Sequence, residues 1–348
     1  MPNSIKPLIV PVFIPNAGCP HRCVFCNQST ITGMSAAHLS PKFVEHQIES
    51  FLAGCRISSR RVQIAFYGGN FLGLDKSDVI RLLSVASGYV TKGIAHSLRF
   101  STRPDTIDSD RLESISGFPV ATVELGVQSM NDTVLARANR GHGACDTRAA
   151  VTSLKRAGYE IGLQLMVGLP GDTATACLQS ARETVALKPD FVRIYPTLVI
   201  AGSALARFYA QGRYRPWTLE KSVSTVKQMM GVFARNAIPV IRMGLQPTAD
   251  LIAGSSIIAG PFHPSFGHLV KSEIYFDRAM TQIQQIRDPL GSPVTLWVHP
   301  RSVSQMQGLN KSNIKRLALA LDIETVSVKG DPDVREGRIV IRIGSEIK

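Results

Sequence analysis

The sequence predicts an α/β fold: an open, partial barrel of six βα units followed by a small C-terminal α/β domain. Short β-rich apolar runs alternate with helix-like stretches over the first two-thirds of the chain. This alternation is typical of parallel βαβ units, whose right-handed crossovers curl the sheet. Because six units are too few to close an eight-fold barrel, we expect a partial (βα)6 TIM-like barrel.

The expected elements follow one another in a regular order. The strands are LIVPVFI (8–14), VQIAFY (62–67), SLRFS (97–101), VATVELG (120–126), EIGLQLMVG (160–168) and DFVRIYP (190–196). The helix-like stretches between them are 41–54, 75–88, 146–157 and 173–187. Ser40 followed by Pro41 suits the start of the first helix, because serine caps a helix and proline is tolerated at its first position.

Three parts are expected along the chain. Residues 1–245 form the partial barrel, and residues 246–288 form a loop-rich connection that ends in a helix near 270–287. The proline- and glycine-rich stretch at 288–293 marks a boundary. Residues 289–348 then form a small α/β domain, with strand, helix, tight loop and helix in order, followed by two more strands.

Composition and charge limit the class of protein. The chain has 348 residues, 44% of them hydrophobic, and no apolar run reaches the ~18–20 residues that cross a bilayer. The start of the chain lacks the features of a signal peptide, so we expect a cytoplasmic protein with no membrane partner. The net charge of +13 favours a polyanionic partner such as RNA, although a solvated basic surface also explains it.

Three of the six cysteines lie within eight residues: Cys19, Cys23 and Cys26. A tight cluster in a reducing compartment indicates a metal site rather than a disulfide framework. Three thiolates on one loop can ligate three irons of a [4Fe–4S] cluster and leave the fourth iron open. The alternative is a zinc site with His21 as fourth ligand, although His21 lies awkwardly between two of the cysteines.

The loop Cys19-Pro-His-Arg-Cys23-Val-Phe-Cys26, with an aromatic residue before its third cysteine, resembles the signature of the radical S-adenosylmethionine (SAM) superfamily. The resemblance implies that SAM chelates the open iron and that reduced flavodoxin or ferredoxin supplies an electron. SAM is then cleaved to a 5′-deoxyadenosyl radical, which abstracts hydrogen from the substrate. The partial six-unit barrel of this superfamily agrees with the expected strands.

Segments that follow the later strands resemble the SAM-binding segments of this superfamily. Adjacent glycines after the second strand let the backbone approach a ligand closely. An arginine fork suits the SAM carboxylate, and methionine fills space against the adenine. The resemblance implies these SAM-binding residues: Gly68, Gly69, Asn70, Ser101, Arg103, Glu124, Gln128, Ser129, Arg140, Met166, Gly168 and Leu169.

The stretch RIYPTLVI (193–200) resembles the Elongator catalytic subunit, and the likeness extends over about residues 8–245. That family modifies the wobble uridine of tRNA with an acetyl group from a C-terminal acetyltransferase domain. About a hundred residues follow Leu245, fewer than we expect for such a domain. Arg193, Tyr195 and Arg213 are the expected catalytic residues on the substrate side; the alternative is packing for Tyr195 and surface positions for the arginines.

The order of elements in the C-terminal domain resembles the minimal KH RNA-binding unit, in which a GxxG loop between two helices contacts the nucleic-acid backbone. Here the loop is Gly308-Leu-Asn-Lys311, with lysine in place of the second glycine. Lys311, Lys315 and Arg316 are therefore the expected RNA-binding residues. The alternative is a small cap that completes the open barrel.

The sequence leaves three hypotheses for function. The first is a radical SAM enzyme that modifies RNA, with tRNA as the substrate. The second is a radical SAM oxidoreductase that acts on a small metabolite, as coproporphyrinogen dehydrogenases do. The third is a non-catalytic, cluster-bearing protein that binds RNA or senses redox state.

Overall fold

The structure is a computed structural model that describes residues 7–14, 17–27, 39–55, 61–245, 256–286, 293–322 and 325–343. It divides into two compact units. The first comprises residues 1–222 and 229–264, and the second comprises residues 223–228 and 265–348. Each unit has its own sheet, so the two are treated separately.

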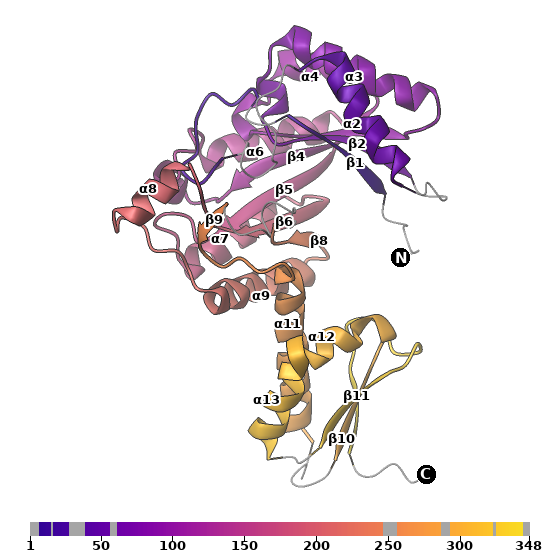
Figure 1. Cartoon of the computed structure of the whole chain (residues 1–348), viewed down its shortest axis with the longest axis vertical. Helices are drawn as coiled ribbons and strands as arrows, with labels where there is room; N and C mark the ends of the chain where they lie inside the picture. The colour runs from indigo at the N-terminus through magenta and orange to yellow at the C-terminus, as the bar shows by residue number, and fades with distance from the viewer. Residues whose placement is uncertain are drawn as a thin grey trace. The chain divides into compact units, whose positions relative to one another are not determined.

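The first unit is built on a curled sheet of seven parallel strands (Figure 1). The strands are β1 (Leu8–Phe13), β2 (Val62–Tyr67), β3 (Ser97–Thr102), β4 (Val120–Gln128), β5 (Glu160–Val167), β6 (Phe191–Pro196) and β8 (Val240–Met243). They are paired in the same order as in the chain. Such an order keeps each crossover on the same hand, which confirms the predicted partial barrel; β8 extends it by a seventh strand.

Helices connect these strands. They are α2 (Pro41–Ala53), α3 (Lys76–Thr91), α4 (Ser109–Ile115), α5 (Asp132–Arg137), α6 (Ala144–Arg156), α7 (Ala174–Ala186), α8 (Ala204–Ala210) and α9 (Leu219–Arg235). The first helix begins as the sequence predicts, because the Ser40 hydroxyl accepts a hydrogen bond from the Phe43 amide. Thr173 caps α7 in the same way through the Ala176 amide.

A two-stranded antiparallel ribbon lies outside the main sheet. It pairs β7 (Val199–Ile200) with β9 (Ile257–Ala259). The pairing ties residues 256–260 to the segment that follows β6. The sequence analysis did not predict this ribbon, because strands of two and three residues are too short to show an alternating pattern.

The core beneath β1, β2 and β3 contains a run of three aromatic rings. Phe71 lies 4.8 Å from Phe66 and 4.8 Å from Phe100, between ring centroids. All three side chains are fully buried. The run holds the short 3-10 turn at Phe71–Gly73 against the ends of β2 and β3.

The second unit packs helices on one face of a three-stranded sheet with the order β11-β10-β12. Its elements are α11 (Phe266–Gln284), β10 (Val294–Val298), α12 (Val303–Gln307), α13 (Ser312–Leu321), β11 (Val326–Gly330) and β12 (Val340–Ile343). Tyr275, Ala279 and Ile283 of α11 belong to its core, so this unit includes the helix that the sequence analysis assigned to the connection. Residues 287–292, at the expected boundary, lie outside the described residues.

None of the helices in the described part of the chain is long and apolar enough to cross a membrane.

We predict that Phe100→Ala lowers the free energy of unfolding by about 3–5 kcal/mol, because it leaves a cavity beside Phe71. Urea denaturation measures the change. Ile80→Ala on α3, at a side chain that is 38% exposed, is the control and should shift the transition little. Equal shifts for the two variants would contradict this account of the core.

Candidate functional site

The cysteine loop, residues 17–27, follows β1 and contains no regular helix or strand. Its shape is set by two neighbouring segments. The Val24 amide donates to the carbonyl of Ala138 (3.1 Å), and the Val24 carbonyl accepts from the Leu205 amide (2.7 Å). The loop is therefore fixed between the segment after α5 and the start of α8.

Two asparagine side chains reinforce this clamp. Asn27 Nδ2 donates to the Ala201 carbonyl (2.7 Å), directly after Cys26. Asn139 Nδ2 donates to the Arg22 carbonyl (2.9 Å), directly before Cys23. Each bond fixes the backbone next to a cysteine and so limits where its thiol can lie.

Gly141 is required where the second segment passes the loop. Its φ is +70°, and a Cβ there would lie 2.3 Å from the ring of His21. Only glycine allows this close approach without strain. His21 thus packs against the backbone of residue 141.

Gly69 and Asn70 support the loop from the end of β2. A Cβ on Gly69 would lie 2.6 Å from the carbonyl oxygens of both Ile14 and Ala17. Asn70 Nδ2 donates to the Gly18 carbonyl (2.8 Å), and Asn70 Oδ1 accepts from the Thr102 hydroxyl (2.7 Å).

Asn70 is completely buried. Its Oδ1 also accepts from the Arg103 amide (2.9 Å) and the Thr106 hydroxyl (3.0 Å). The side chain, expected to contact SAM, is therefore occupied in joining the cysteine loop to the end of β3.

The three cysteines differ in their surroundings. Cys23 is buried, Cys26 is half-buried and Cys19 is exposed. The Cys19 thiol interacts electrostatically with Cys23, Arg103 and Arg140. Among the described residues, no three His, Cys, Asp or Glu side chains are gathered as a metal-binding group in this structure.

Two buried arginines lie beside the thiols. Arg140 Nη1 donates to Cys23 Sγ (3.1 Å), and Arg140 Nη2 donates to the Gly126 carbonyl. Arg103 forms a bidentate pair with Asp105, with bonds of 2.9 and 2.8 Å, and donates to the Arg140 carbonyl. Arg103 Nη1 and Arg140 Nε are buried and have no hydrogen-bond partner among the described residues.

This donor set fits an iron–sulfur cluster and an anionic ligand. Three thiols on a short loop are the ligands that such a cluster takes, and adjacent cations offset the negative charge of thiolates. The unpartnered N–H groups of the two arginines can donate to a carboxylate.

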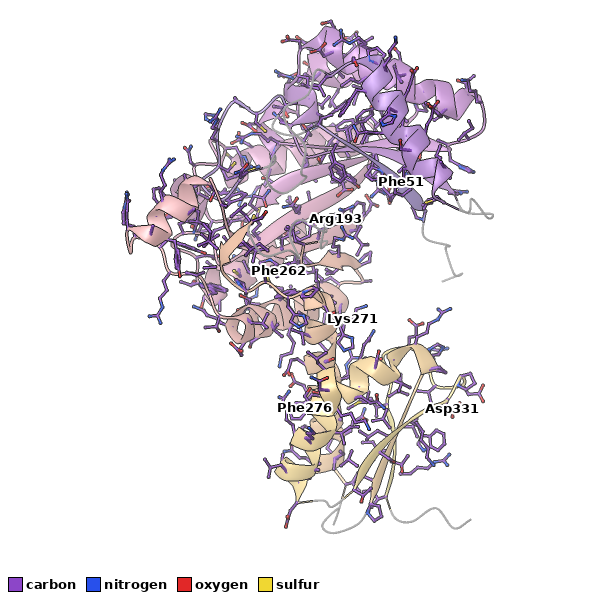
Figure 2. The ribbon with its side chains drawn as sticks, in the orientation of Figure 1. Phe51, Arg193, Phe262, Lys271, Phe276 and Asp331 are labelled. Carbon is purple, nitrogen blue, oxygen red and sulfur yellow. The ribbon has the colours of Figure 1, made fainter. Side chains whose placement is uncertain are left out.

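The interior of the curled sheet holds a charged network centred on Glu124. Glu124 Oε1 accepts from Arg99 Nη1 (3.0 Å), Arg193 Nη2 (2.9 Å) and the Tyr67 hydroxyl (2.8 Å). Arg193 Nε lies 2.8 Å from Glu124 Oε2. Figure 2 shows Arg193 among the strands of this sheet.

The network joins β2, β3, β4 and β6. Burial and the charge of Glu124 raise the pKa of Tyr67. Arg193 Nη1 also reaches the Tyr195 hydroxyl at 3.5 Å. Glu124 was expected to contact SAM and Arg193 to face the substrate. In the structure these two side chains form an ion pair with each other.

Gln128, Ser129 and Ser101 have polar partners of their own. Gln128 Oε1 accepts from Gln164 Nε2 (2.9 Å). The Ser129 hydroxyl lies 3.3 Å from that of Ser180 on α7. The Ser101 hydroxyl lies 3.5 Å from the Phe66 carbonyl, at the limit of a hydrogen bond.

Met166 and Leu169 lie in an apolar cluster with Val24 and Phe25 of the cysteine loop, and Tyr195 packs against it. Gly168 sits at its edge: its amide donates to Asp172 Oδ2 (3.0 Å), and its carbonyl accepts from the Tyr214 hydroxyl (2.7 Å). The apolar residues predicted for the adenine therefore lie beside the cysteine loop.

The other predicted residues lie elsewhere. Arg213 is exposed after α8, over the ring of Phe208 (4.6 Å). In the second unit, Lys311 and Lys315 are exposed, and Arg316 is paired with Glu273. Asn310 and Lys311 both have positive φ, so the loop after Gly308 turns sharply without a second glycine.

Two family models match the chain. The Radical SAM superfamily model matches residues 13–183, and the Radical_SAM C-terminal domain model matches residues 189–275. The chain belongs to the radical SAM superfamily. The match runs from the end of β1 through the cysteine loop and includes the strands that carry Glu124 and Met166 and the loop that carries Arg140.

The relatives of this radical SAM enzyme include proteins of the Elongator type. A tRNA uridine(34) acetyltransferase of Dehalococcoides mccartyi is 25% identical over 252 residues, which are 62% of this chain and 55% of that protein. Elongator complex protein 3 of Saccharomyces cerevisiae is 28% identical over 196 residues, 49% of this chain and 34% of that protein. The matched part of this chain thus spans about half the length of the first relative and about a third of the length of the second.

A solved structure shares the fold of this radical SAM enzyme. Elp3 of Methanocaldococcus infernus, with an N-terminal deletion, superposes with a TM-score of 0.58 at 21% identity. The superposition covers 80% of this chain and 63% of the other. This likeness supports the curled parallel sheet.

Sequence reasoning missed the partners of the predicted site residues. Arg99, Tyr67 and Asn27 were not singled out, although each contributes to the network or to the clamp. Polar residues at alternating positions in otherwise apolar strands, as in VQIAFY and SLRFS, were the available signal for the network. The clamp left no such signal, because its backbone bonds and its asparagine side chains join segments that are distant in the sequence.

We predict that Glu124→Gln lowers the free energy of unfolding by about 3–5 kcal/mol, because it leaves the buried guanidinium group of Arg193 without its carboxylate and leaves Arg99 with only the more exposed Glu160, at 3.7 Å. Urea denaturation measures the change. Glu113→Gln, at an exposed position on α4, is the matched control. Unfolding of both variants at the same urea concentration would show that the Glu124 network does not stabilise the fold.

His142 gives the fold a dependence on pH. Its side chain is fully buried, and burial together with Arg140 lowers the pKa of His142 to about 4. The ordinary pKa of histidine is about 6.5. Between these values only the unfolded chain takes up the proton, so stability is complete above about pH 6.5 and falls as the pH drops towards 4.

We predict that acidification over this interval costs the wild type about 3 kcal/mol more than His142→Leu, which removes the titrating group. Urea midpoints measured at several pH values for both proteins test this. Groups common to the two proteins cancel in the comparison. Parallel pH profiles would show that His142 is not kept neutral by the fold.

Proposed function

We propose that this radical SAM enzyme modifies RNA, with tRNA as its substrate. The observation that carries the chemistry is the cysteine loop with buried Arg103 and Arg140 at its side. The substrate class rests on the relatives, among them a tRNA uridine(34) acetyltransferase, and on the net charge of +13, which suits a polyanion.

In this proposal Cys19, Cys23 and Cys26 hold a [4Fe–4S] cluster whose open iron takes SAM. When bound, the cluster and SAM supply one-electron chemistry that removes a hydrogen atom from the substrate. Reduced flavodoxin or ferredoxin is the proposed electron donor.

The residues of the chain position these groups. The free N–H groups of Arg103 and Arg140 bind the SAM carboxylate, because a guanidinium donates well to an anion in a buried setting. Gly69 lets the end of β2 pack directly against the backbone of the loop, since a Cβ there would meet the carbonyls of Ile14 and Ala17. Met166 and Leu169 supply an apolar surface that keeps water from the adenosyl group.

Tyr195 and Arg193 form the substrate side. Tyr195 packs against the apolar cluster while its hydroxyl lies 3.5 Å from Arg193. Arg193 is fixed by Glu124, so Tyr195 is held between the apolar cluster and the charged network. Arg213, which is exposed after α8, serves as a contact for the RNA backbone.

The test is a turnover assay under anaerobic conditions. The reconstituted protein is reduced with dithionite, given SAM and assayed for 5′-deoxyadenosine with and without total tRNA. We predict product that rises with tRNA, and none from Cys23→Ala. Product that ignores tRNA would contradict the RNA substrate and favour a small metabolite. A wild type as inactive as Cys23→Ala would overturn SAM cleavage and favour a cluster-bearing sensor or binding protein.

A further inference from the structure

The sheet of the second unit has two different faces. Val294, Leu296 and Val298 of β10 point into the core formed with α11, α12 and α13. Figure 1 shows these helices on one side of β10 and β11. Because side chains alternate along a strand, Thr295 and Trp297 point to the opposite face.

The strand register identifies the rest of that face. Trp297 lies opposite Lys329 on β11 and Val340 on β12. Thr295 lies opposite Ser327 and Arg342. We call these six residues the tryptophan face: Thr295, Trp297, Ser327, Lys329, Val340 and Arg342.

The tryptophan face combines an aromatic ring with two cations. Lys329 Nζ lies 5.3 Å from the centroid of the Trp297 ring, and the Arg342 guanidinium lies 5.1 Å from it. Trp297 Nε1 has no hydrogen-bond partner among the described residues. Val340 is 46% exposed. Trp297 is on the central strand, so both neighbouring strands bring a cation to it.

One of the two predicted RNA-binding residues on α13, Arg316, already has partners within the protein. Arg316 is paired with Glu273 and lies 3.8 Å from the centroid of the Phe276 ring on α11. Binding RNA there would break this pair. Between β11 and β12, the carboxylate of Glu336 is paired with Arg301 (3.3 Å).

We propose that the tryptophan face binds single-stranded RNA. A base stacks on Trp297, and Lys329 and Arg342 move from the ring to the flanking phosphates. Stacking on an aromatic ring with adjacent cations is the usual chemistry of single-strand binding, because every unpaired base has a free face and every phosphate a negative charge. The hydroxyls of Thr295 and Ser327, which lie 2.9 Å from each other, offer polar contacts to the base or the ribose.

This inference rests on the proposed RNA substrate and adds where the second unit contacts it. A duplex has its bases stacked on one another, so the tryptophan face should prefer a single strand to a duplex. Stacking and phosphate contacts, rather than hydrogen bonds to base edges, carry most of the proposed binding, so the affinity should change little with the RNA sequence.

The first test measures affinity with the full-length chain and a fluorescein-labelled single-stranded oligouridine, with the matching duplex as comparison. We predict that Trp297→Leu weakens binding about tenfold or more and that Trp297→Phe restores most of it. Lys329→Glu/Arg342→Glu should weaken binding and lower its salt dependence. Circular dichroism establishes that each variant is folded.

The matched control is Lys311→Glu/Lys315→Glu, which makes the same change of charge on the loop and helix of the same unit. We predict that it binds more tightly than Lys329→Glu/Arg342→Glu. Equal losses in both double variants would mean general electrostatic attraction and would overturn the tryptophan face. A larger loss in the control would place the RNA on the Gly308–Lys311 loop instead.

The second test uses fluorescence. The chain has two tryptophans, so in Trp217→Phe the emission comes from Trp297 alone. We predict that the oligouridine quenches this emission in step with binding. RNA that binds without any change in emission would overturn the tryptophan face and leave the proposed function standing. A wild type that binds neither oligouridine nor tRNA would instead overturn the RNA substrate itself.

Discussion

The cysteine loop has no regular secondary structure, so the proposed cluster and SAM sites depend on the hydrogen bonds that fix its shape. Bonds from Ala138, Asn139, Ala201 and Leu205 hold the loop on two sides. Asn70 holds it on a third. Asn70 comes shortly after β2, Ala138 and Asn139 lie in the connection from β4 to β5, and Ala201 and Leu205 lie in the connection from β6 to β8. A parallel sheet brings the carboxyl ends of its strands to one edge, so distant segments meet around three thiols.

The charged network centred on Glu124 fills part of the interior of the curled sheet. A curled sheet of seven strands leaves an interior that side chains must fill, and here several are charged. Glu124 lies between Arg99 and Arg193 where water is largely excluded, and Glu160 supplies a second carboxylate 3.7 Å from Arg99. The same contacts fix Arg193 beside Tyr195. The network thus links the packing of the barrel to the residues proposed for the substrate side.

Much of the fold could be predicted from the sequence because its pattern is local. The six predicted strands match β1 to β6 closely, and Ser40 does cap α2. The ribbon of β7 and β9 and the helix α8 could not be predicted in this way, because they are short and are held by contacts with distant residues. In the candidate site, residue types indicated the chemistry, whereas the partners of Asn70 and Glu124 required the register of neighbouring strands.

The central claim is that the clamped loop carries a [4Fe–4S] cluster whose open iron binds SAM. Electron paramagnetic resonance of the reconstituted, dithionite-reduced protein, recorded before and after SAM is added, tests it most directly. We expect a reduced-cluster signal that changes when SAM binds, and no such signal from Cys23→Ala. A signal that SAM leaves unchanged, or a wild type that takes up no more iron than Cys23→Ala, would contradict the claim.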